Sequence, residues 1–177
     1  MKILVMTGSP HKDGTAALLA DKFIEGAKEA GHEIYRFDAG FKNIHPCTAC
    51  YTCQNTDNGC VFKDDEQELY PQVLAADAVV FVAPIYYYGM CAQLKLAIDR
   101  FFALGDTLKS AKKCALLLTC EDETTESVEG AIATITGMCN YLGWRIKDII
   151  SALSCLDRAA MDKTDYPQKA YELGKSF

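Results

Sequence analysis

The sequence predicts a three-layer α/β fold built on a five-stranded parallel sheet in the order 2-1-3-4-5. Short apolar runs alternate with longer amphipathic segments along the whole chain, which is the pattern of repeated strand–helix–strand units. The run Ala78–Ala83 is apolar on both faces, as expected for a central parallel strand. Right-handed crossovers leave few topologies for five such strands, and this order is common at this chain length.

The first third of the chain supplies two strands and one helix. Lys2–Thr7 is a short apolar run that predicts a buried strand. Thr15–Ala30 repeats apolar residues at helical spacing, and Gly31 stands at the position where helices commonly end. Glu33–Asp38 is the second predicted strand.

The middle of the chain is predicted from a central strand and its flanking helices. Asp64 or Asp65 can cap a helical segment that Pro71 is expected to break in two. The central strand Ala78–Ala83 is expected to end at Pro84. Cys91–Leu104 has apolar residues on one side and is the next predicted helix.

The last third continues the alternation. Cys114–Thr119 is a fourth buried strand, and Ser127–Leu142 is a helix stopped by Gly143. Trp144–Ser151 is the fifth strand, with Trp144 itself expected in the core. Tyr166–Leu173 is a short last helix.

Composition limits the class of protein. A chain of 177 residues matches one domain, and we expect residues 1–177 to form it. The formal net charge of −6 argues against nucleic-acid or anionic-membrane partners, which need a basic face. The sequence shows neither a signal-peptide pattern nor an apolar run of membrane-spanning length, and its nine cysteines are an odd number. We therefore expect a cytoplasmic protein with free thiols.

Two loops follow strands at the edge where ligands bind in such sheets. The loop Gly8–Thr15 opens a helix, so its backbone N–H groups and the hydroxyls of Ser9 and Thr15 can hold an anion. It matches neither a Walker A loop nor a dinucleotide fingerprint, which favours a mononucleotide phosphate. A turn that only reverses the chain is an equally good interpretation of this loop alone.

The second loop, Ala83–Met90, holds three consecutive tyrosines and a glycine, which suit a flat ring system. At least one of Tyr86, Tyr87 and Tyr88 is expected to be a core residue instead. A third loop, Thr119–Thr125, is small and acidic and could form another wall of the site.

Four cysteines gather in one loop as Cys47-x2-Cys50-x2-Cys53-x6-Cys60. Thiolates this close can ligate an iron–sulfur cluster, bind zinc or act as redox or free thiols. The loop follows the second strand and is expected at the same sheet edge as the anion loop. The other five cysteines are scattered, behave as small hydrophobic residues and are expected in the core; they are Cys91, Cys114, Cys120, Cys139 and Cys155. Cys120 alone stands where it could face the ligand.

The ordered motifs resemble those of the flavodoxin-like NAD(P)H-dependent FMN reductase family. They are Gly8-Ser9-Pro10 with Gly14-Thr15, Pro46-Cys47, Asp64-Asp65, Ala83-Pro84-Ile85-Tyr86, Gln93-Leu94-Lys95 and Ile98-Asp99-Arg100. The resemblance runs from Lys2 to about Thr125. It implies a flavodoxin-like three-layer sandwich, FMN as cofactor and NAD(P)H as co-substrate.

The resemblance also implies site residues. Those implied to hold the FMN phosphate are Ser9, His11, Gly14, Thr15 and Ala16. Those implied to flank the flavin ring are Pro84, Ile85, Tyr86, Tyr87 and Gly89. Those implied at its far side are Thr119, Glu121 and Asp122.

The four-cysteine spacing resembles the motif of the iron–sulfur flavoprotein branch of that superfamily. This implies a [4Fe–4S] cluster held by Cys47, Cys50, Cys53 and Cys60. The alternatives for these four cysteines are free or redox thiols and a zinc site. The expected function is a flavin oxidoreductase that passes electrons from NAD(P)H to a small-molecule acceptor or a redox protein. An electron-transfer flavoprotein and a thiol- or metal-binding module without turnover remain as alternatives, and family analogy predicts a homodimer or larger homo-oligomer.

Overall fold

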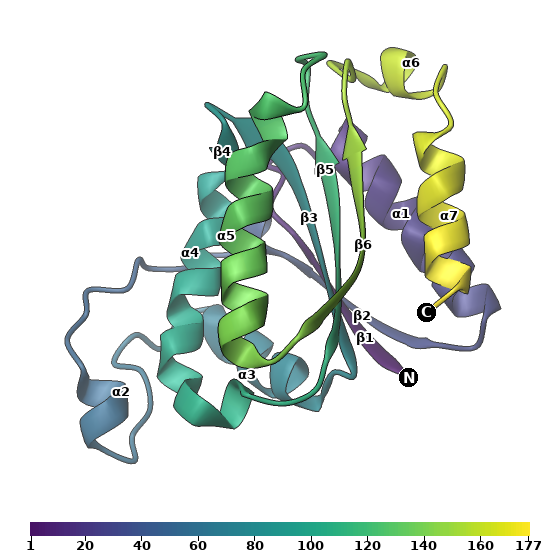
Figure 1. Cartoon of the computed structure of the whole chain (residues 1–177). Helices are drawn as coiled ribbons and strands as arrows, with labels where there is room; N and C mark the ends of the chain where they lie inside the picture. Colours follow the sequence, from purple (N-terminus) through teal and green to yellow (C-terminus); the bar gives the residue numbers. More distant parts are fainter.

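The computed structural model describes residues 1–177 and contains the predicted parallel sheet, in the order β2-β1-β3-β5-β6 (Figure 1). The strands are β1 (Lys2–Thr7), β2 (Glu33–Asp38), β3 (Ala78–Tyr86), β4 (Gly89–Met90), β5 (Lys113–Thr119) and β6 (Arg145–Ala152). Every neighbouring pair along this path is parallel. Counted without the two-residue β4, the order is the predicted 2-1-3-4-5.

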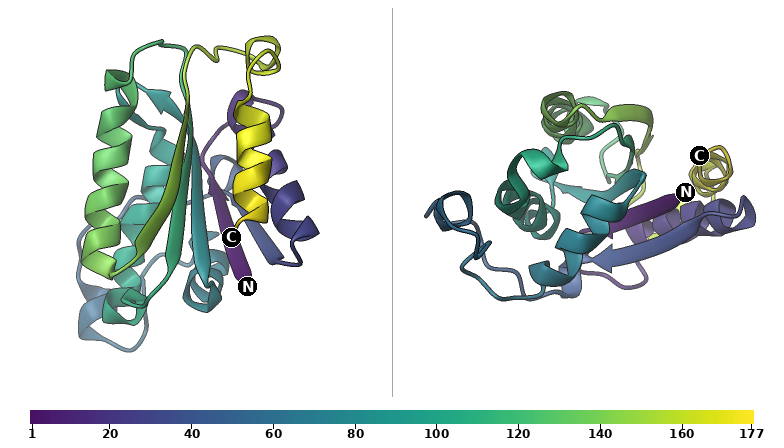
Figure 2. Two further views of the ribbon diagram at one scale, coloured as in Figure 1. Left: turned by 45° about the vertical axis from the view of Figure 1, so that its right-hand side comes forward. Right: turned by 90° about the horizontal axis from the view of Figure 1, so that it is seen from below.

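Helices cover both faces of the sheet and give the three-layer arrangement (Figure 2). The helices are α1 (Thr15–Glu29), α2 (Thr52–Asn55), α3 (Glu66–Ala75), α4 (Ala92–Arg100), α5 (Glu126–Leu142), α6 (Arg158–Met161) and α7 (Tyr166–Lys175), with 3-10 turns η1 (Ala39–Phe41) and η2 (Phe101–Leu108). Helices α1 and α7 pack on one face, and α3, α4 and α5 on the other. None of these helices combines the length and the apolar character that a membrane crossing requires.

Two apolar layers hold the sheet between the helices. Phe23 of α1 and Leu173 of α7 belong to one, and Leu94 of α4 and Val128 of α5 belong to the other. The five scattered cysteines are buried as predicted, and so is Trp144, whose indole N–H donates to the Leu108 carbonyl at 3.2 Å.

The predictions about two prolines are wrong. Pro71 lies inside α3 without breaking it, because Leu69 and Val73 on either side are fully buried and their packing outweighs one lost backbone hydrogen bond. Strand β3 also continues past Pro84. Pro84 pairs with Thr119 at the edge of the parallel ladder, and Ile85 then pairs with Met90 of β4 in an antiparallel hairpin.

The tip of that hairpin is Tyr87-Tyr88. Both residues have left-handed backbone angles, with φ of 47° and 63°. The expectation that one of the three tyrosines is core is wrong, because Tyr86 and Tyr88 are exposed and Tyr87 is fully so. An aromatic pair in a conformation that favours glycine and asparagine is strained, and such strain is concentrated at functional sites.

Candidate functional site

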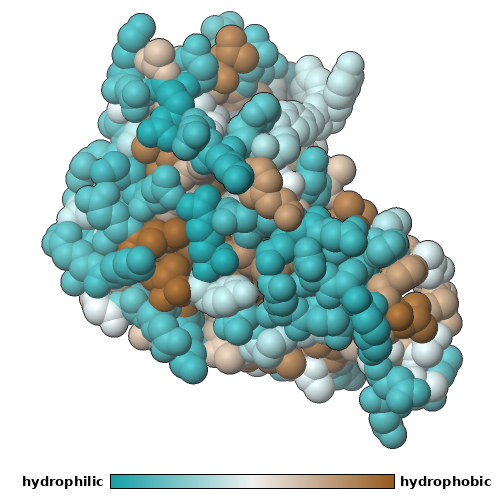
Figure 3. Space-filling model, turned by 180° about the vertical axis from the view of Figure 1, so that it is seen from behind, coloured by the Kyte–Doolittle hydropathy of each residue, from teal (hydrophilic) through white to brown (hydrophobic).

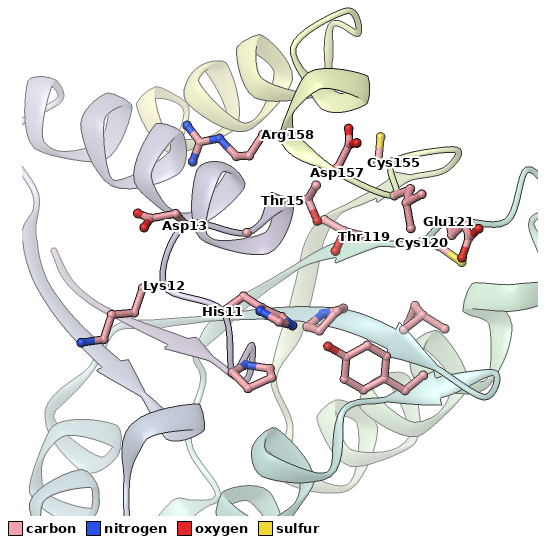
Figure 4. Close-up of a pocket in the computed structure, with 16 residues that line it drawn as sticks. His11, Lys12, Asp13, Thr15, Thr119, Cys120, Glu121, Cys155, Asp157 and Arg158 are labelled. Atoms are coloured by element: carbon pink, nitrogen blue, oxygen red, sulfur yellow. The ribbon is translucent and has the colours of Figure 1, made fainter.

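A cavity of about 760 Å³ opens at the carboxyl ends of the parallel strands (Figure 4). This is the edge at which open α/β sheets bind ligands, and the size lies in the usual range for small-molecule sites. The lining residues are Pro10, His11, Lys12, Asp13, Gly14, Thr15, Pro84, Ile85, Tyr86, Thr119, Cys120, Glu121, Cys155, Leu156, Asp157 and Arg158.

One end of the cavity is built to receive an anion. Helix α1 begins after Gly14 with no side-chain cap, so its first N–H groups have no side-chain acceptor. The Ser9 hydroxyl instead accepts a hydrogen bond from the His11 N–H at 3.1 Å and so shapes the preceding loop. Arg158 adds a positive charge to the same wall, and the helix dipole favours negative charge there.

The other end of the cavity is lined by less polar residues. Pro84, Ile85 and Tyr86 line it, and Thr119, which pairs with Pro84 in the sheet, lies beside them with Cys120. The backbone N–H of Cys155 donates to the Cys120 carbonyl at 2.8 Å, which joins the loop after β6 to this wall. A ring system placed here would extend from an anionic group held at the start of α1.

The structure brings eight of the thirteen predicted cofactor residues into this cavity. They are His11, Gly14, Thr15, Pro84, Ile85, Tyr86, Thr119 and Glu121. Ser9 lies behind the loop as a buried support, Ala16 is buried within α1, and Gly89 pairs with Tyr86 in the hairpin. Tyr87 and Asp122 line a neighbouring cavity instead.

Sequence reasoning missed the loop after β6, which contributes Cys155, Leu156, Asp157 and Arg158. Asp157 caps α6 by accepting from the Ala160 N–H at 2.8 Å, and this positions Arg158 beside the start of α1. The rule that all parallel strands end at one edge applies equally to the last strand, so this loop could have been included.

The residues present fit FMN. Uncapped helix N–H groups and Arg158 match a phosphate, while Pro84, Ile85 and Tyr86 provide a wall suited to a flat ring. The cavity combines both environments in one space of sufficient size.

The four loop cysteines surround a separate hollow, and the prediction that they share the edge of the anion loop is wrong. They line a hollow of about 20 Å³ with Arg100 and Phe102, and this hollow has no lining residue in common with the main cavity. Helix α4 starts beside β4 and runs back along the sheet for nine residues, about 14 Å, to Arg100. The cysteine segment projects at the end of the molecule opposite α6 and β4 (Figures 1 and 2).

A buried ion pair closes the neck of the cysteine segment. The Arg100 guanidinium donates to Asp64 Oδ2 at 2.9 Å, and both side chains are almost completely buried. Arg100 also donates to the His45 carbonyl at 2.8 Å and the Phe62 carbonyl at 3.3 Å, on either side of the four cysteines. Burial alone would raise the pKa of Asp64, but hydrogen bonds from Arg100 and His45 outweigh it and lower the pKa to about 2.

Asp99 and Arg100, neighbours near the end of α4, have different partners. Asp99 binds Lys95 on the surface of α4, while Arg100 points inward to Asp64. Arg100 has a structural role, and its partner Asp64 comes from the far end of the cysteine segment.

The cysteine hollow fits a thiolate-bound group by donor type but not by present geometry. All four cysteines are free, yet no three Cys, His, Asp or Glu side chains in the chain are grouped closely enough to hold a metal ion. Ala49 and Tyr51, on either side of Cys50, have left-handed backbone angles with φ of 52° and 58°. Hydrogen bonds from Thr52 lower the pKa of the Cys50 thiol.

Comparison with known families decides the assignment. The family model described as NADPH-dependent FMN reductase matches residues 1–139. The chain belongs to the NADPH-dependent FMN reductase family. The matched residues include the Gly8–Thr15 loop, the cysteine segment and the Ala83–Met90 hairpin.

Among individual relatives of this family member are two proteins named iron-sulfur flavoprotein. One, from Archaeoglobus fulgidus, is 36% identical over 105 residues, covering 59% of this chain and 47% of its own length. The other, from Methanosarcina thermophila, is 37% identical over 100 residues, covering 56% and 52%. The chain spans about half the length of the curated relatives it matches.

Solved structures share the fold of this FMN reductase family member at low sequence identity. An NAD(P)H:quinone oxidoreductase from Methanothermobacter marburgensis superposes with a TM-score of 0.78 at 19% identity, covering 99% of this chain and 95% of the other. An azoreductase from Bacillus anthracis gives 0.78 at 16% identity over the whole of both chains. These likenesses establish the flavodoxin-like architecture.

Proposed function

We propose that the protein is an FMN-dependent oxidoreductase that takes hydride from NAD(P)H and passes electrons to a second acceptor. The observation that carries this proposal is the two-ended cavity, with an uncapped helix start at one end and the Pro84–Tyr86 wall at the other. Family membership supports the same cofactor.

Each part of the cavity has a task in this proposal. The first N–H groups of α1, the Thr15 hydroxyl and Arg158 hold the phosphate, and Ser9 keeps the loop in shape. Pro84, Ile85 and Tyr86 orient the ring, and Thr119 with Glu121 limits the opposite side. Bound FMN supplies the redox chemistry, while the chain supplies position and electrostatics.

The net reaction is balanced by the two substrates. With a quinone as acceptor, NAD(P)H gives up a hydride, solvent gives a proton, and the products are NAD(P)⁺ and the hydroquinone. A solved structure of the same fold is named as a quinone oxidoreductase and another as an azoreductase, which supports small-molecule acceptors of these classes.

Absorption spectra and rapid mixing test the proposal. Purified protein reconstituted with FMN should show flavin absorption, and anaerobic mixing with NADH or NADPH should bleach it within seconds. A protein that binds no FMN, or whose flavin neither nicotinamide reduces, contradicts it.

A second function, electron transfer through a [4Fe–4S] cluster, is favoured by the four cysteines around one hollow and by relatives named iron-sulfur flavoprotein. Because the hollow is too small at present, the segment between Arg100's two carbonyl contacts would have to open. Anaerobic reconstitution with iron and sulfide should give a broad brown shoulder that is lost in Cys53→Ser and kept in Cys139→Ser, which changes a buried core cysteine. The same shoulder in both variants would exclude Cys53 as a ligand and contradict a cluster held by all four loop cysteines.

We also propose a homodimer or larger homo-oligomer. The projecting cysteine segment carries exposed hydrophobic side chains, seen at the lower right of the space-filling view (Figure 3). Tyr51 and Val61 on this segment are about half exposed, and Tyr51 packs edge-on against the half-exposed Phe102. Light scattering should give a molar mass of more than one chain for the unmodified protein. The double variant Tyr51→Ser/Phe102→Ser should have a lower molar mass.

The proposed location is a reducing compartment such as the cytoplasm. All nine cysteines are free, which suits an environment that keeps thiols reduced.

A further inference from the structure

A second cavity of about 560 Å³ adjoins the first one. The two share Ile85, Cys120 and Glu121 as lining residues, so a ligand in the second cavity would lie next to the ring end of the first. The remaining lining residues of the second cavity are Tyr87, Tyr88, Asp122, Glu123, Ser127 and Ser154.

The tyrosine wall of this cavity has a fixed backbone. Tyr87 and Tyr88 form the tip of the β3–β4 hairpin and expose their rings to solvent. Helix α5 supports the tip from behind at Gly130, where an added Cβ would lie 2.4 Å from the Tyr88 carbonyl oxygen. Aromatic rings presented on a supported turn are suited to stacking against a flat ligand.

The opposite wall is acidic and is also fixed. Asp122 Oδ2 accepts from the Ser127 hydroxyl at 2.7 Å, and Asp122 Oδ1 accepts from the Thr124 N–H at 3.0 Å. These bonds lower the pKa of Asp122, with the Ser127 bond as the largest cause. Glu121 and Glu123 flank it, and the lining of the second cavity includes no Lys, Arg or His.

The two cavities therefore differ in charge. The first has Lys12, His11 and Arg158 beside Asp13 and Asp157 at its anion end, whereas no basic side chain lines the second, whose charged residues are all carboxylates. We propose that the second cavity is the acceptor site and that it selects flat aromatic ligands that are cationic or neutral over anionic ones. This inference rests on the proposed function, because it names the class of acceptor for that reaction.

Two physical effects give the same selectivity. Tyrosine faces attract cations through the ring quadrupole, and the carboxylates attract them by Coulomb interaction. One carboxylate about 8 Å from a unit charge in water changes affinity roughly twofold, so exchanging a positive for a negative ligand changes it about fivefold. Three carboxylates, partly screened by salt, should separate the two ligands by at least about tenfold.

The test uses two redox-inert probes of the same shape, 2-naphthyltrimethylammonium and 2-naphthalenesulfonate. Their dissociation constants for the FMN-loaded protein are measured by calorimetry at low ionic strength, with tyrosine fluorescence as a second signal. The cation should bind at least about tenfold more tightly, and the ratio should shrink as salt is added. Equal affinities, a preference for the sulfonate, or no binding of either probe would overturn the inference.

Variants then locate the effect. Glu123 lines only the second cavity, so Glu123→Gln should lower the cation-to-anion ratio roughly threefold. Tyr87→Ala should weaken both probes together because it removes a stacking face. Glu33→Gln makes the same change of charge at the opposite edge of the sheet and should leave both constants unchanged. A Glu123→Gln ratio equal to that of the unmodified protein would place the selectivity elsewhere and overturn the inference.

FMN binding is measured independently by flavin absorption. A protein that fails to bind FMN contradicts the proposed function, whereas one that binds and reduces FMN but does not discriminate between the probes contradicts only the acceptor-site inference.

Discussion

The carboxyl group of Glu66 offers the sharpest test of the buried electrostatics. Its side chain is completely buried at the start of α3, and neither carboxyl oxygen has a hydrogen-bond partner. Burial raises the pKa of Glu66 to about 8, although the positive charge of Arg100 opposes this shift. Glu66 is therefore protonated in the folded protein at neutral pH and ionised in the unfolded chain.

The sign of the pH effect follows from proton counts. Between the unfolded pKa of 4.5 and the folded pKa of about 8, the folded state holds one more proton than the unfolded state. The free energy of unfolding thus falls by about 1.4 kcal/mol per pH unit in this window. The contribution of Glu66 to the free energy of unfolding is fully present below pH 4.5. About 4 to 5 kcal/mol of this free energy is lost by the time the pH has risen through 8.

The change Glu66→Gln removes this titration and keeps the shape of the side chain. Urea unfolding gives the free energy of unfolding of the unmodified protein and of the variant at each pH. The free energy of the variant minus that of the unmodified protein should increase by about 4 kcal/mol between pH 5 and pH 9. A constant offset from the unpaired amide does not affect this difference. Glu68→Gln is the matched control, because Glu68 is exposed on the same helix and should change stability by less than about 0.5 kcal/mol at every pH.

One result would refute the reasoning. If the Glu66→Gln and unmodified curves stay parallel from pH 5 to pH 9, then Glu66 is ionised in the folded state. In that case Arg100, whose Nε also has no hydrogen-bond partner, would balance the charge of Glu66 through a bound water molecule.

Three further changes test other parts of the structure. Arg158→Ala should weaken FMN binding about tenfold and leave riboflavin binding unchanged, since only FMN carries the phosphate. The control Arg145→Ala should alter neither dissociation constant. Equal weakening of both ligands by Arg158→Ala would contradict a phosphate contact. Arg100→Met should lower the free energy of unfolding by about 3 to 5 kcal/mol, measured in urea, because it leaves a buried carboxylate unpaired. Gly130→Ala should shift the tip of the hairpin, because the new Cβ would meet the Tyr88 carbonyl. This change should weaken the binding of both naphthyl probes without changing FMN affinity. Unchanged probe affinity would show that the tip does not contribute to the second cavity.

The sheet was predictable from sequence because its strands are short apolar runs bounded by turn residues. Lys2–Thr7 and Glu33–Asp38 match the observed strands to the residue. Local rules failed where tertiary contacts outweighed them. Pro71 remains helical because its neighbours are buried. Tyr87 and Tyr88 form a turn whose two central positions hold no glycine, asparagine or aspartate.

The candidate site was predictable in part for the same reason. Strand ends fix where a loop begins, and eight of the thirteen predicted residues, all at or after the ends of β1, β3 and β5, line the main cavity. A long loop can travel away from the strand that starts it. The cysteine segment leaves β2 and folds back to the end of α4, and its destination depends on the pairing of Arg100 with Asp64, which are 36 residues apart.

This separation bears on how the two proposed redox groups could work together. The main cavity lies at the carboxyl ends of the strands, whereas the cysteine hollow includes Arg100 at the end of α4, a helix of about 14 Å that runs back along the sheet. The buried ion pair of Arg100 and Asp64 fixes the neck of the cysteine segment, and neither residue lines the main cavity. Changes in the cysteines should therefore leave FMN binding intact, so cysteine variants can separate nicotinamide-dependent flavin reduction from any transfer through a cluster. A reductase needs the first of these steps, whereas an electron-transfer flavoprotein needs the second and little nicotinamide turnover.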